Sequence, residues 1–289
     1  MTLHRRPRAR VATALATAAL LACADAAATA AVRYASFRSP SLGRQVSYAV
    51  DVPPAYDGND RRYGVVYALH GLFESHTFWE RRGLAAALAR MRETGGGDFL
   101  VVAVDGGRSF FVNVPVGAYE DLVTKDLIAH VESTYRVAPG RSHRALLGVS
   151  MGGYAALRIA FKDPALFAAV ATHSAMLIEQ VPTPEQGAGR WHMDAFHAVF
   201  GDPIDAALWA ENDPLAWART ADPKTAPALS FDCGAQDRYG FAAGHRELDR
   251  ILSGRGVAHR FELPPGDHGY EYVRARIETS LGFLGRALH

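Results

Sequence analysis

Apolar residues recur along this chain in patterns that predict β-strands. Near the start, the runs 32–37 and 46–52 flank a turn at Ser39-Pro40, and the second run alternates apolar residues with polar ones or alanine. This alternation is typical of a half-exposed strand, so the two runs predict an antiparallel hairpin at a sheet edge. Further strands are predicted at residues 65–69, 99–104, 145–147, 167–172, 228–233 and 257–263.

The runs 65–69 and 99–104 are continuously apolar and rich in β-branched residues, which is typical of strands buried on both faces of a parallel sheet. Helix-like segments lie between the strands, at residues 78–91, 119–135, 154–161, 244–252 and 270–288. Strands that alternate with helices predict a doubly wound, mostly parallel sheet with an antiparallel start. We expect one domain over residues 32–289.

The segment 176–227 departs from this alternation. It contains several prolines and no strand-like run, and three of the four tryptophans fall in it: Trp191, Trp209 and Trp217. An insertion at this point would lie over the C-terminal ends of the strands, where open α/β sheets bind ligands. We therefore expect a short helical cap whose tryptophans either contact substrate or only hold loops against the domain.

A serine motif lies between a predicted strand and a predicted helix. The sequence Gly148-Val149-Ser150-Met151-Gly152 matches G-x-S-x-G, the pattern of a nucleophile elbow. Such an elbow forces the serine into a cramped backbone geometry, and the two glycines avoid the collisions that a Cβ would cause. Ser150 is therefore the predicted nucleophile.

A serine hydroxyl is a weak nucleophile at neutral pH, so it needs a base and an acid that orients the base. Elbows of this kind place the three residues in the order serine, acid, histidine. His268 lies just after the last predicted strand, and Asp237 lies just after the preceding one. We predict Ser150, Asp237 and His268 as a catalytic triad.

Such a mechanism also needs backbone N–H groups that stabilise an oxyanion. One donor is the residue after the nucleophile, Met151, and the second comes from the loop after an earlier strand. That loop begins His70-Gly71-Leu72, so Leu72 is the predicted second donor, with Phe73 as the alternative. Phe73 is also a candidate substrate contact.

Other ionisable residues fit these roles less well. Asp232 lies within its predicted strand, and Asp267 is too close to His268 in sequence to orient it easily. Histidines in or near the cap are more typical of surface or core positions: His173, His192 and His197. No H-E-x-x-H motif or clustered Cys/His spacing indicates a metal site, and the predicted chemistry needs no cofactor.

Residues 1–31 resemble a cleaved signal peptide, with a basic start, an apolar run over 11–22 and small residues after it. This predicts a secreted or periplasmic protein without a stable membrane span. The sequence Leu20-Leu21-Ala22-Cys23 leaves open a lipoprotein anchored through Cys23. After cleavage Cys233 is the only cysteine, so no internal disulfide is expected, and we expect Cys233 to be a small buried hydrophobic residue.

The composition is that of an ordinary soluble domain. Of the 289 residues, 49% are hydrophobic and 21% are charged, and the formal net charge is +1. Because the basic residues form no clustered face, a nucleic-acid partner is not expected. A small-molecule ester is the expected partner, and the oligomeric state stays open.

The chain resembles the esterase D family, which includes S-formylglutathione hydrolases, tributyrin and feruloyl esterases, and mycolyltransferases. The motifs that carry the resemblance are His70-Gly71-Leu72, Tyr135-Arg136-Val137, the elbow with its continuation Gly153-Tyr154-Ala155-Ala156-Leu157, Asp163-Pro164 with Phe167, Cys233-Gly234 before Asp237, and Gly266-Asp267-His268. The resemblance implies an α/β-hydrolase fold, and it implies the same triad and the same oxyanion donors, Leu72 and Met151. One departure follows His268, where Gly269-Tyr270-Glu271-Tyr272 replaces a stretch that often bears tryptophan.

These observations predict a serine carboxylesterase that acts through an acyl-enzyme on short-chain or aromatic acyl esters. An acyltransferase that moves an acyl group to a sugar or alcohol acceptor stays open, because sequence does not separate the two. S-Formylglutathione hydrolysis is disfavoured for an exported enzyme. A non-catalytic binding protein on this scaffold is disfavoured because such a protein would usually have lost a triad member.

Overall fold

The computed structural model describes residues 1–2, 31–184 and 192–288. Nearly all of the predicted signal peptide, including Cys23, lies outside the described residues, and so does Trp191. Among the helices of the described residues, none is long and apolar enough to cross a bilayer.

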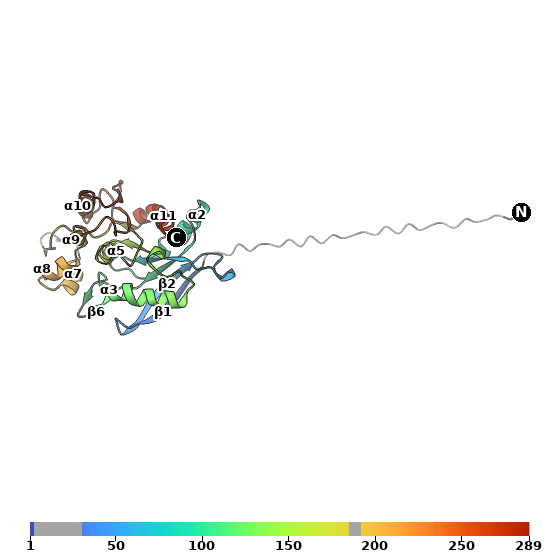
Figure 1. The fold of residues 1–289 in the computed structure, drawn as a ribbon, viewed down its shortest axis with the longest axis horizontal. Helices are drawn as coiled ribbons and strands as arrows, with labels where there is room; N and C mark the ends of the chain where they lie inside the picture. The colour runs from blue at the N-terminus through green and yellow to red at the C-terminus, as the bar shows by residue number, and fades with distance from the viewer. Residues whose placement is uncertain (3–30, 185–191, 289) are drawn as a thin grey trace.

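An eight-stranded sheet runs through the centre of the molecule (Figure 1). Its strands lie in the order β1 (Ala31–Ser39), β2 (Arg44–Val52), β4 (Phe99–Val104), β3 (Gly64–Leu69), β7 (Arg144–Val149), β8 (Ala169–His173), β9 (Ala228–Asp232) and β10 (His259–Glu262). Strand β2 pairs antiparallel with both β1 and β4, and the remaining neighbours are parallel. This is the predicted mostly parallel sheet with an antiparallel start.

Helices cover both faces of the sheet, because the central strands are apolar on both sides. Alternate residues of β3 point to opposite faces: Val66 and Ala68 pack toward one set of helices, and Val65 and Tyr67 pack toward the other. The first set is α1 (Phe78–Arg81), α2 (Leu84–Glu93) and α11 (Tyr270–Ala287). The second includes η2 (Leu122–Leu127), α4 (Ile128–Thr134), α5 (Met151–Lys162) and α10 (Phe241–Gly254).

Several element boundaries differ from the predictions. The predicted helix 78–91 is two helices, because Gly83 adopts a φ of 87° between α1 and α2. The predicted helix 119–135 consists of α3 (Tyr119–Asp121), the π-helical η2 and α4 in succession. A small hairpin of β5 (Asn113–Val114) and β6 (Gly117–Ala118) was not predicted, nor were the short 3₁₀ helices η1 (Tyr56–Gly58) and η3 (Arg141–His143).

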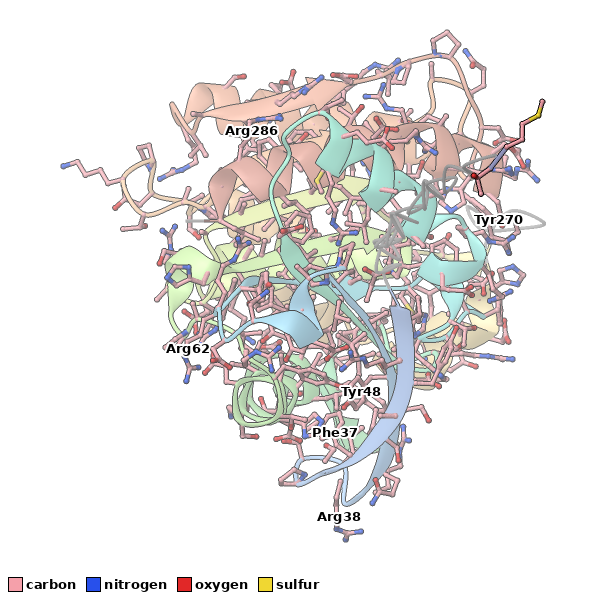
Figure 2. All side chains as sticks on the ribbon, turned by 90° about the vertical axis from the view of Figure 1, so that its right-hand side faces the viewer. Phe37, Arg38, Tyr48, Arg62, Tyr270 and Arg286 are labelled. Atoms are coloured by element: carbon pink, nitrogen blue, oxygen red, sulfur yellow. The ribbon has the colours of Figure 1, made fainter. Side chains whose placement is uncertain are left out.

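The β1–β2 hairpin packs against α4 through aromatic rings (Figure 2). The ring of Phe37 stacks on His130 with the centroids 4.5 Å apart. The Tyr48 hydroxyl lies 3.0 Å from His130 Nε2 and 3.0 Å from the Tyr135 hydroxyl. These contacts bury the apolar side of a hairpin that stands at the margin of the sheet.

The segment between β8 and β9 contains α7 (Met193–Phe200), α8 (Ala206–Asn212) and α9 (Pro214–Ala218), as expected for a helical cap. Aspartates begin two of these helices. The carboxylate of Asp205 accepts hydrogen bonds from two backbone N–H groups of α8, and that of Asp213 does the same for α9. Such N-caps satisfy backbone donors that have no partner within the helix.

A fully buried arginine joins this cap to helix α5. Arg158, on α5, donates to the side-chain oxygen of Asn212 on α8 at 2.6 Å and to the carbonyl of Phe111 at 2.6 Å. It also forms an ion pair with Glu120 at 2.5 Å. The Tyr154 hydroxyl donates to the carbonyl of Asn212 at 2.6 Å. The cap is thus held to α5, which begins directly after Ser150.

Candidate active site

Ser150 occupies the turn between β7 and α5, with φ 52° and ψ −117°. The close packing of the elbow explains its two glycines. A Cβ at Gly148 would overlap the carbonyl oxygen of Gly152, and a Cβ at Gly152 would overlap the carbonyl oxygen of Leu69. Backbone hydrogen bonds fix the turn, since the Ser150 N–H donates to the carbonyl of His173 at 3.1 Å. The strained serine is therefore held by its surroundings.

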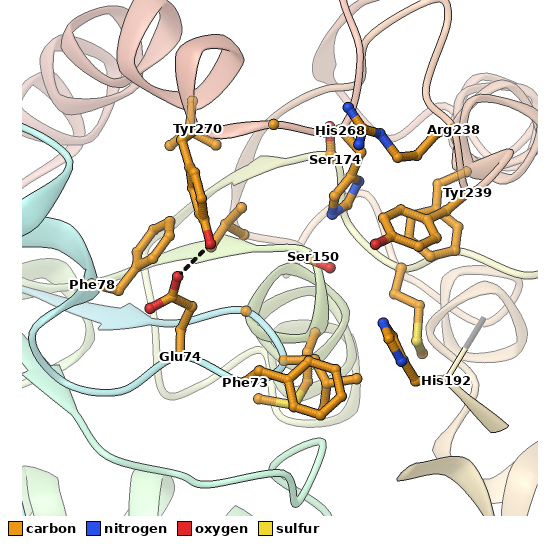
Figure 3. A pocket seen from close by; sticks show the side chains of 18 of the residues that line it. Phe73, Glu74, Phe78, Ser150, Ser174, His192, Arg238, Tyr239, His268 and Tyr270 are labelled. Carbon is orange, nitrogen blue, oxygen red and sulfur yellow. Dashed lines mark hydrogen bonds between the residues drawn. The ribbon is translucent and has the colours of Figure 1, made fainter. Parts of the chain in front are cut away.

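The structure brings His268 and Asp237 together from two neighbouring loops. Asp237 follows β9 and His268 follows β10, and His268 Nδ1 lies 2.8 Å from Asp237 Oδ2. The Asp237 side chain is fully buried, whereas that of His268 is 16% exposed. Figure 3 shows the His268 imidazole pointing toward Ser150 across the pocket. An Nδ1–H held by the carboxylate leaves Nε2 free to accept a proton.

Hydrogen-bond donors surround the Asp237 carboxylate on both oxygens. Oδ1 accepts the N–H of Tyr239 at 2.9 Å, and Oδ2 accepts the Cys233 thiol at 3.4 Å as well as His268. Burial by itself would raise the pKa of Asp237, but the hydrogen bonds and the electrostatic attraction of the neighbouring His268 ring outweigh it and lower the pKa of this carboxyl. Asp237 is therefore ionised at neutral pH.

The Cys233 thiol has a more specific role than the hydrophobic one expected from its sequence pattern. Burial and the neighbouring Asp237 charge raise the pKa of Cys233. The thiol therefore stays protonated and donates a hydrogen bond to the carboxylate. Sequence reasoning missed this contact, although the spacing of four residues between Cys233 and Asp237 is visible in the chain.

We expect Cys233→Ala to lower kcat for the predicted ester hydrolysis about fivefold, because one hydrogen bond to the Asp237 carboxylate is lost. Cys233→Ser retains a donor of similar size and should fall by less. Steady-state kinetics of both variants test this expectation. Equal kcat values for the alanine variant and the wild-type protein would show that the thiol only fills space.

The two predicted oxyanion donors, Leu72 and Met151, both line the same pocket as Ser150. Met151 is the first residue of α5, so its N–H has no acceptor within the helix. The loop that carries Leu72 lies against the elbow, since a Cβ at Gly71 would lie 3.5 Å from the Cβ of Ser150. The two N–H groups are therefore on segments that meet beside the serine.

His70 holds this loop in place, a role that sequence reasoning did not assign. The ring is fully buried, and burial lowers the pKa of His70, so the ring is neutral. Its Nδ1–H donates to the carbonyl of Gly71 at 2.8 Å, and its Nε2 accepts the N–H of Gly106 at 3.0 Å. The loop after β3 is thereby tied to the loop after β4.

Asp232, the alternative acid, belongs to a different network. Its carboxylate lies 3.0 Å from Nδ1 of the buried His173, and Oδ1 accepts the Tyr272 hydroxyl at 2.7 Å. Arg276 adds an ion pair at 3.5 Å. These contacts join β8, β9 and α11 behind the site, so Asp232 and His173 stabilise the elements that flank the Asp237 and His268 loops.

The pocket around Ser150 has a volume of about 450 Å³, within the range of small-molecule sites. Aromatic and apolar side chains form much of its wall, among them Phe110, Phe196, Tyr239 and Phe241. Phe73, a predicted substrate contact, lines the pocket and is 47% exposed. Arg108 lies 4.4 Å from its ring centroid, and the His192 ring makes a T-shaped contact with it.

Residues that could hold a metal do not gather in groups of three anywhere in the described part of the chain.

Of the two roles expected for the cap tryptophans, Trp209 and Trp217 take the structural one and do not contact the pocket. Trp209 is buried behind the pocket wall, with its ring centroid 5.1 Å from that of Phe200 and 6.2 Å from that of Phe196. Trp217 donates its indole N–H to the carbonyl of Glu211 at 2.7 Å, and neither tryptophan lines the pocket. Both hold the cap together, and Phe196 takes the place at the pocket that the prediction gave to Trp209.

Comparisons with known proteins agree with this geometry. The chain matches the family described as "Putative esterase" over residues 39–284. It is 24% identical over 283 residues to Esterase MT1326 of Mycobacterium tuberculosis (strain CDC 1551 / Oshkosh). That alignment covers 88% of this chain and 59% of the relative, so this chain spans less than two thirds of the relative's length.

Two solved structures share the fold. A ferulic acid esterase superposes with a TM-score of 0.76 at 24% identity, over 90% of this chain and 99% of that one. An S-formylglutathione hydrolase from Agrobacterium tumefaciens superposes with a TM-score of 0.73 at 20% identity, over 91% and 97% of the two chains. These structures have the α/β-hydrolase fold that the esterase D resemblance implied. The chain has this fold and belongs to the esterase family that its sequence matches from residue 39 to residue 284.

Proposed function

We propose that this protein is a serine carboxylesterase that hydrolyses short-chain or aromatic acyl esters through an acyl-enzyme. The observation that carries the proposal is the orientation of His268, which Asp237 holds at 2.8 Å while its ring faces Ser150 in an apolar pocket. Membership of the esterase family supports the same reaction class. The apolar, partly aromatic wall suits an acyl group of modest size.

In the proposed reaction His268 Nε2 removes the proton of the Ser150 hydroxyl as its oxygen attacks the ester carbonyl. The negative charge on the carbonyl oxygen is stabilised by the N–H groups of Leu72 and Met151. The tetrahedral intermediate collapses as His268 gives the proton to the departing alcohol, which leaves an acyl group on Ser150. Water then attacks the acyl-enzyme with His268 as the base, and the bond to Ser150 breaks as His268 returns the proton to the serine oxygen and the free acid leaves.

An acyltransferase is the second candidate, because the same acyl-enzyme can react with an alcohol in place of water. The choice depends on how well the pocket binds an acceptor. Phe73 and Tyr270 line the pocket and are half-exposed, so each offers aromatic surface to an acceptor alcohol. Hydrolysis of S-formylglutathione needs the same triad, and the likeness to one such enzyme makes this thioester a useful third substrate.

A single set of assays tests these candidates. Purified protein is incubated with p-nitrophenyl acetate, butyrate and octanoate, with methyl ferulate and with S-formylglutathione, in the presence and absence of glucose or butanol. We expect steady release of the free acid from at least one oxygen ester, preceded by a burst of p-nitrophenol if deacylation is slow. If more of the acyl group is recovered as a new ester of glucose or butanol than as free acid, the transferase is favoured. Failure to turn over any of these substrates would contradict the proposal.

A further inference from the structure

A hydrogen bond crosses the mouth of the pocket between two segments that are far apart in sequence. The Tyr270 hydroxyl donates to Glu74 Oε1 at 2.7 Å, and both residues line the pocket (Figure 3). Glu74 lies two residues after Leu72, and Tyr270 lies two residues after His268. The bond therefore joins the loop of the proposed oxyanion donor to the loop of the proposed base.

Charged side chains hold both partners of this bond in place. Glu74 forms ion pairs with Arg81 and Arg82, and its side chain is only 11% exposed. The Arg82 guanidinium lies 3.3 Å from the centroid of the Tyr270 ring. Although burial by itself would raise the pKa of Glu74, the hydrogen bond from Tyr270 and the two arginines lower it, so Glu74 is an ionised acceptor.

The Tyr270 ring is thus fixed although half of its surface is exposed. Its hydroxyl is bound to Glu74, its face is covered by Arg82, and its centroid lies 6.2 Å from that of the buried Phe78. A side chain with three such contacts loses little further rotamer freedom when a substrate arrives. It can therefore act as a rigid boundary.

One part of the pocket is lined by Phe78, Val273, Tyr270 and Glu74, and we call this part the recess. Phe78 and Val273 are almost fully buried, so the end of the recess is part of the protein core. In Figure 3 Phe78, Glu74 and Tyr270 lie on one side of Ser150, and Tyr239 and His192 lie on the other. A substrate group on the first side would meet Tyr270 as its outer boundary.

We propose that Tyr270, held by Glu74 and Arg82, is a specificity-determining residue that limits the size of the substrate group entering this recess. The inference rests on the proposed esterase function and deepens it. One of the two groups of an ester, acyl or alcohol, occupies the recess while the carbonyl carbon lies at Ser150. Removing the ring opens the recess to solvent at the pocket mouth, so a longer or wider group can extend past it.

Two series of esters test the proposal in the full chain. The first varies the acyl group from acetate to octanoate with p-nitrophenol as the leaving group. The second keeps acetate and varies the alcohol from methanol to 2-naphthol, with released acetic acid as the readout. For Tyr270→Ala we expect the ratio of kcat/KM for the largest substrate to that for the smallest to rise about tenfold in one series, the scale of steric selection in apolar pockets.

Tyr270→Phe is the matched control, because it keeps the ring and removes only the hydroxyl. Its ratios should stay within about threefold of the wild-type values, since Arg82 and Phe78 still hold the ring. Ratios in Tyr270→Ala that equal those of the wild type in both series would overturn the proposal, and so would equal ratios in the two variants. A merely structural role would lower all rates together and leave the ratios unchanged.

The outcome is separable from that of the proposed function. Hydrolysis of the smallest substrates by the wild-type protein, and its loss on removal of Ser150, test the esterase assignment alone. Unchanged ratios in an active Tyr270→Ala protein would refute only the role of Tyr270. Circular dichroism of each variant shows whether it has folded.

Discussion

Ser150→Ala is expected to lower kcat/KM for the best p-nitrophenyl ester by about 10⁴-fold or more. The variant retains the pocket, the oxyanion donors and the His268–Asp237 pair, but it has no oxygen that can attack the carbonyl. Because the substitution removes only the hydroxyl oxygen from a side chain that is not fully buried, the fold should be unaffected. Steady-state kinetics with fresh enzyme at micromolar concentration would measure the residual rate.

The control for this variant is Ser133→Ala. Ser133 is an exposed serine on α4 whose hydroxyl donates only to the carbonyl of His130 at 2.9 Å. We expect its kcat/KM to match that of the wild-type protein. More than a hundredth of the wild-type activity in a folded Ser150→Ala protein would refute the proposed nucleophile.

Arg158→Met is expected to destabilise the protein by about 3–5 kcal/mol, the range found when one member of a buried ion pair is removed. Three acceptors lose their donor together: the Glu120 carboxylate, the Asn212 side chain and the Phe111 carbonyl. Lys162, 3.0 Å from Glu120, compensates part of the loss. The free energy of unfolding, measured by urea denaturation, tests this expectation.

Arg250→Met serves as the comparison for a surface ion pair. Arg250 is 71% exposed and pairs with Glu247 one turn away on α10, so its replacement should change the free energy of unfolding by less than about 1 kcal/mol. If both arginine variants unfold at the same urea concentration, the buried cluster does not hold the cap as we describe. Loss of ester hydrolysis below the unfolding transition of Arg158→Met would show that the cap loosens first.

The elbow and the sheet were predictable because their causes are local in the sequence. A continuous apolar run such as 99–104 fits only a strand covered on both faces, and the structure confirms that strand with the same boundaries. At Ser150, close backbone packing excludes a Cβ at Gly148 and Gly152, so the glycines themselves mark the turn. The order serine, aspartate, histidine then follows from the order of the strands, because Ser150 follows β7, Asp237 follows β9 and His268 follows β10.

The wall of the pocket was not predictable in the same way, because it depends on contacts between distant segments. Trp209 was an attractive candidate as a large aromatic residue in the cap, yet α7 places Phe196 between it and the cavity. Glu74 and Tyr270 are separated by 196 residues, and neither stands in a motif. The helix break at Gly83 shows a third limit, since apolar periodicity does not reveal a single residue with positive φ.

The position of β10 has a consequence for how the proposed esterase activity would be lost on heating. Ser150 follows a strand in the interior of the sheet, whereas His268 follows β10, a four-residue strand at the margin that pairs with β9 alone in the sheet order. Short marginal strands fray at lower free energy than central ones, so their amide hydrogens exchange sooner. Heat inactivation should therefore begin with reversible unfolding of β10, which moves His268 out of the site while the rest of the protein stays folded. The turn that carries Ser150 should unfold only at higher temperature.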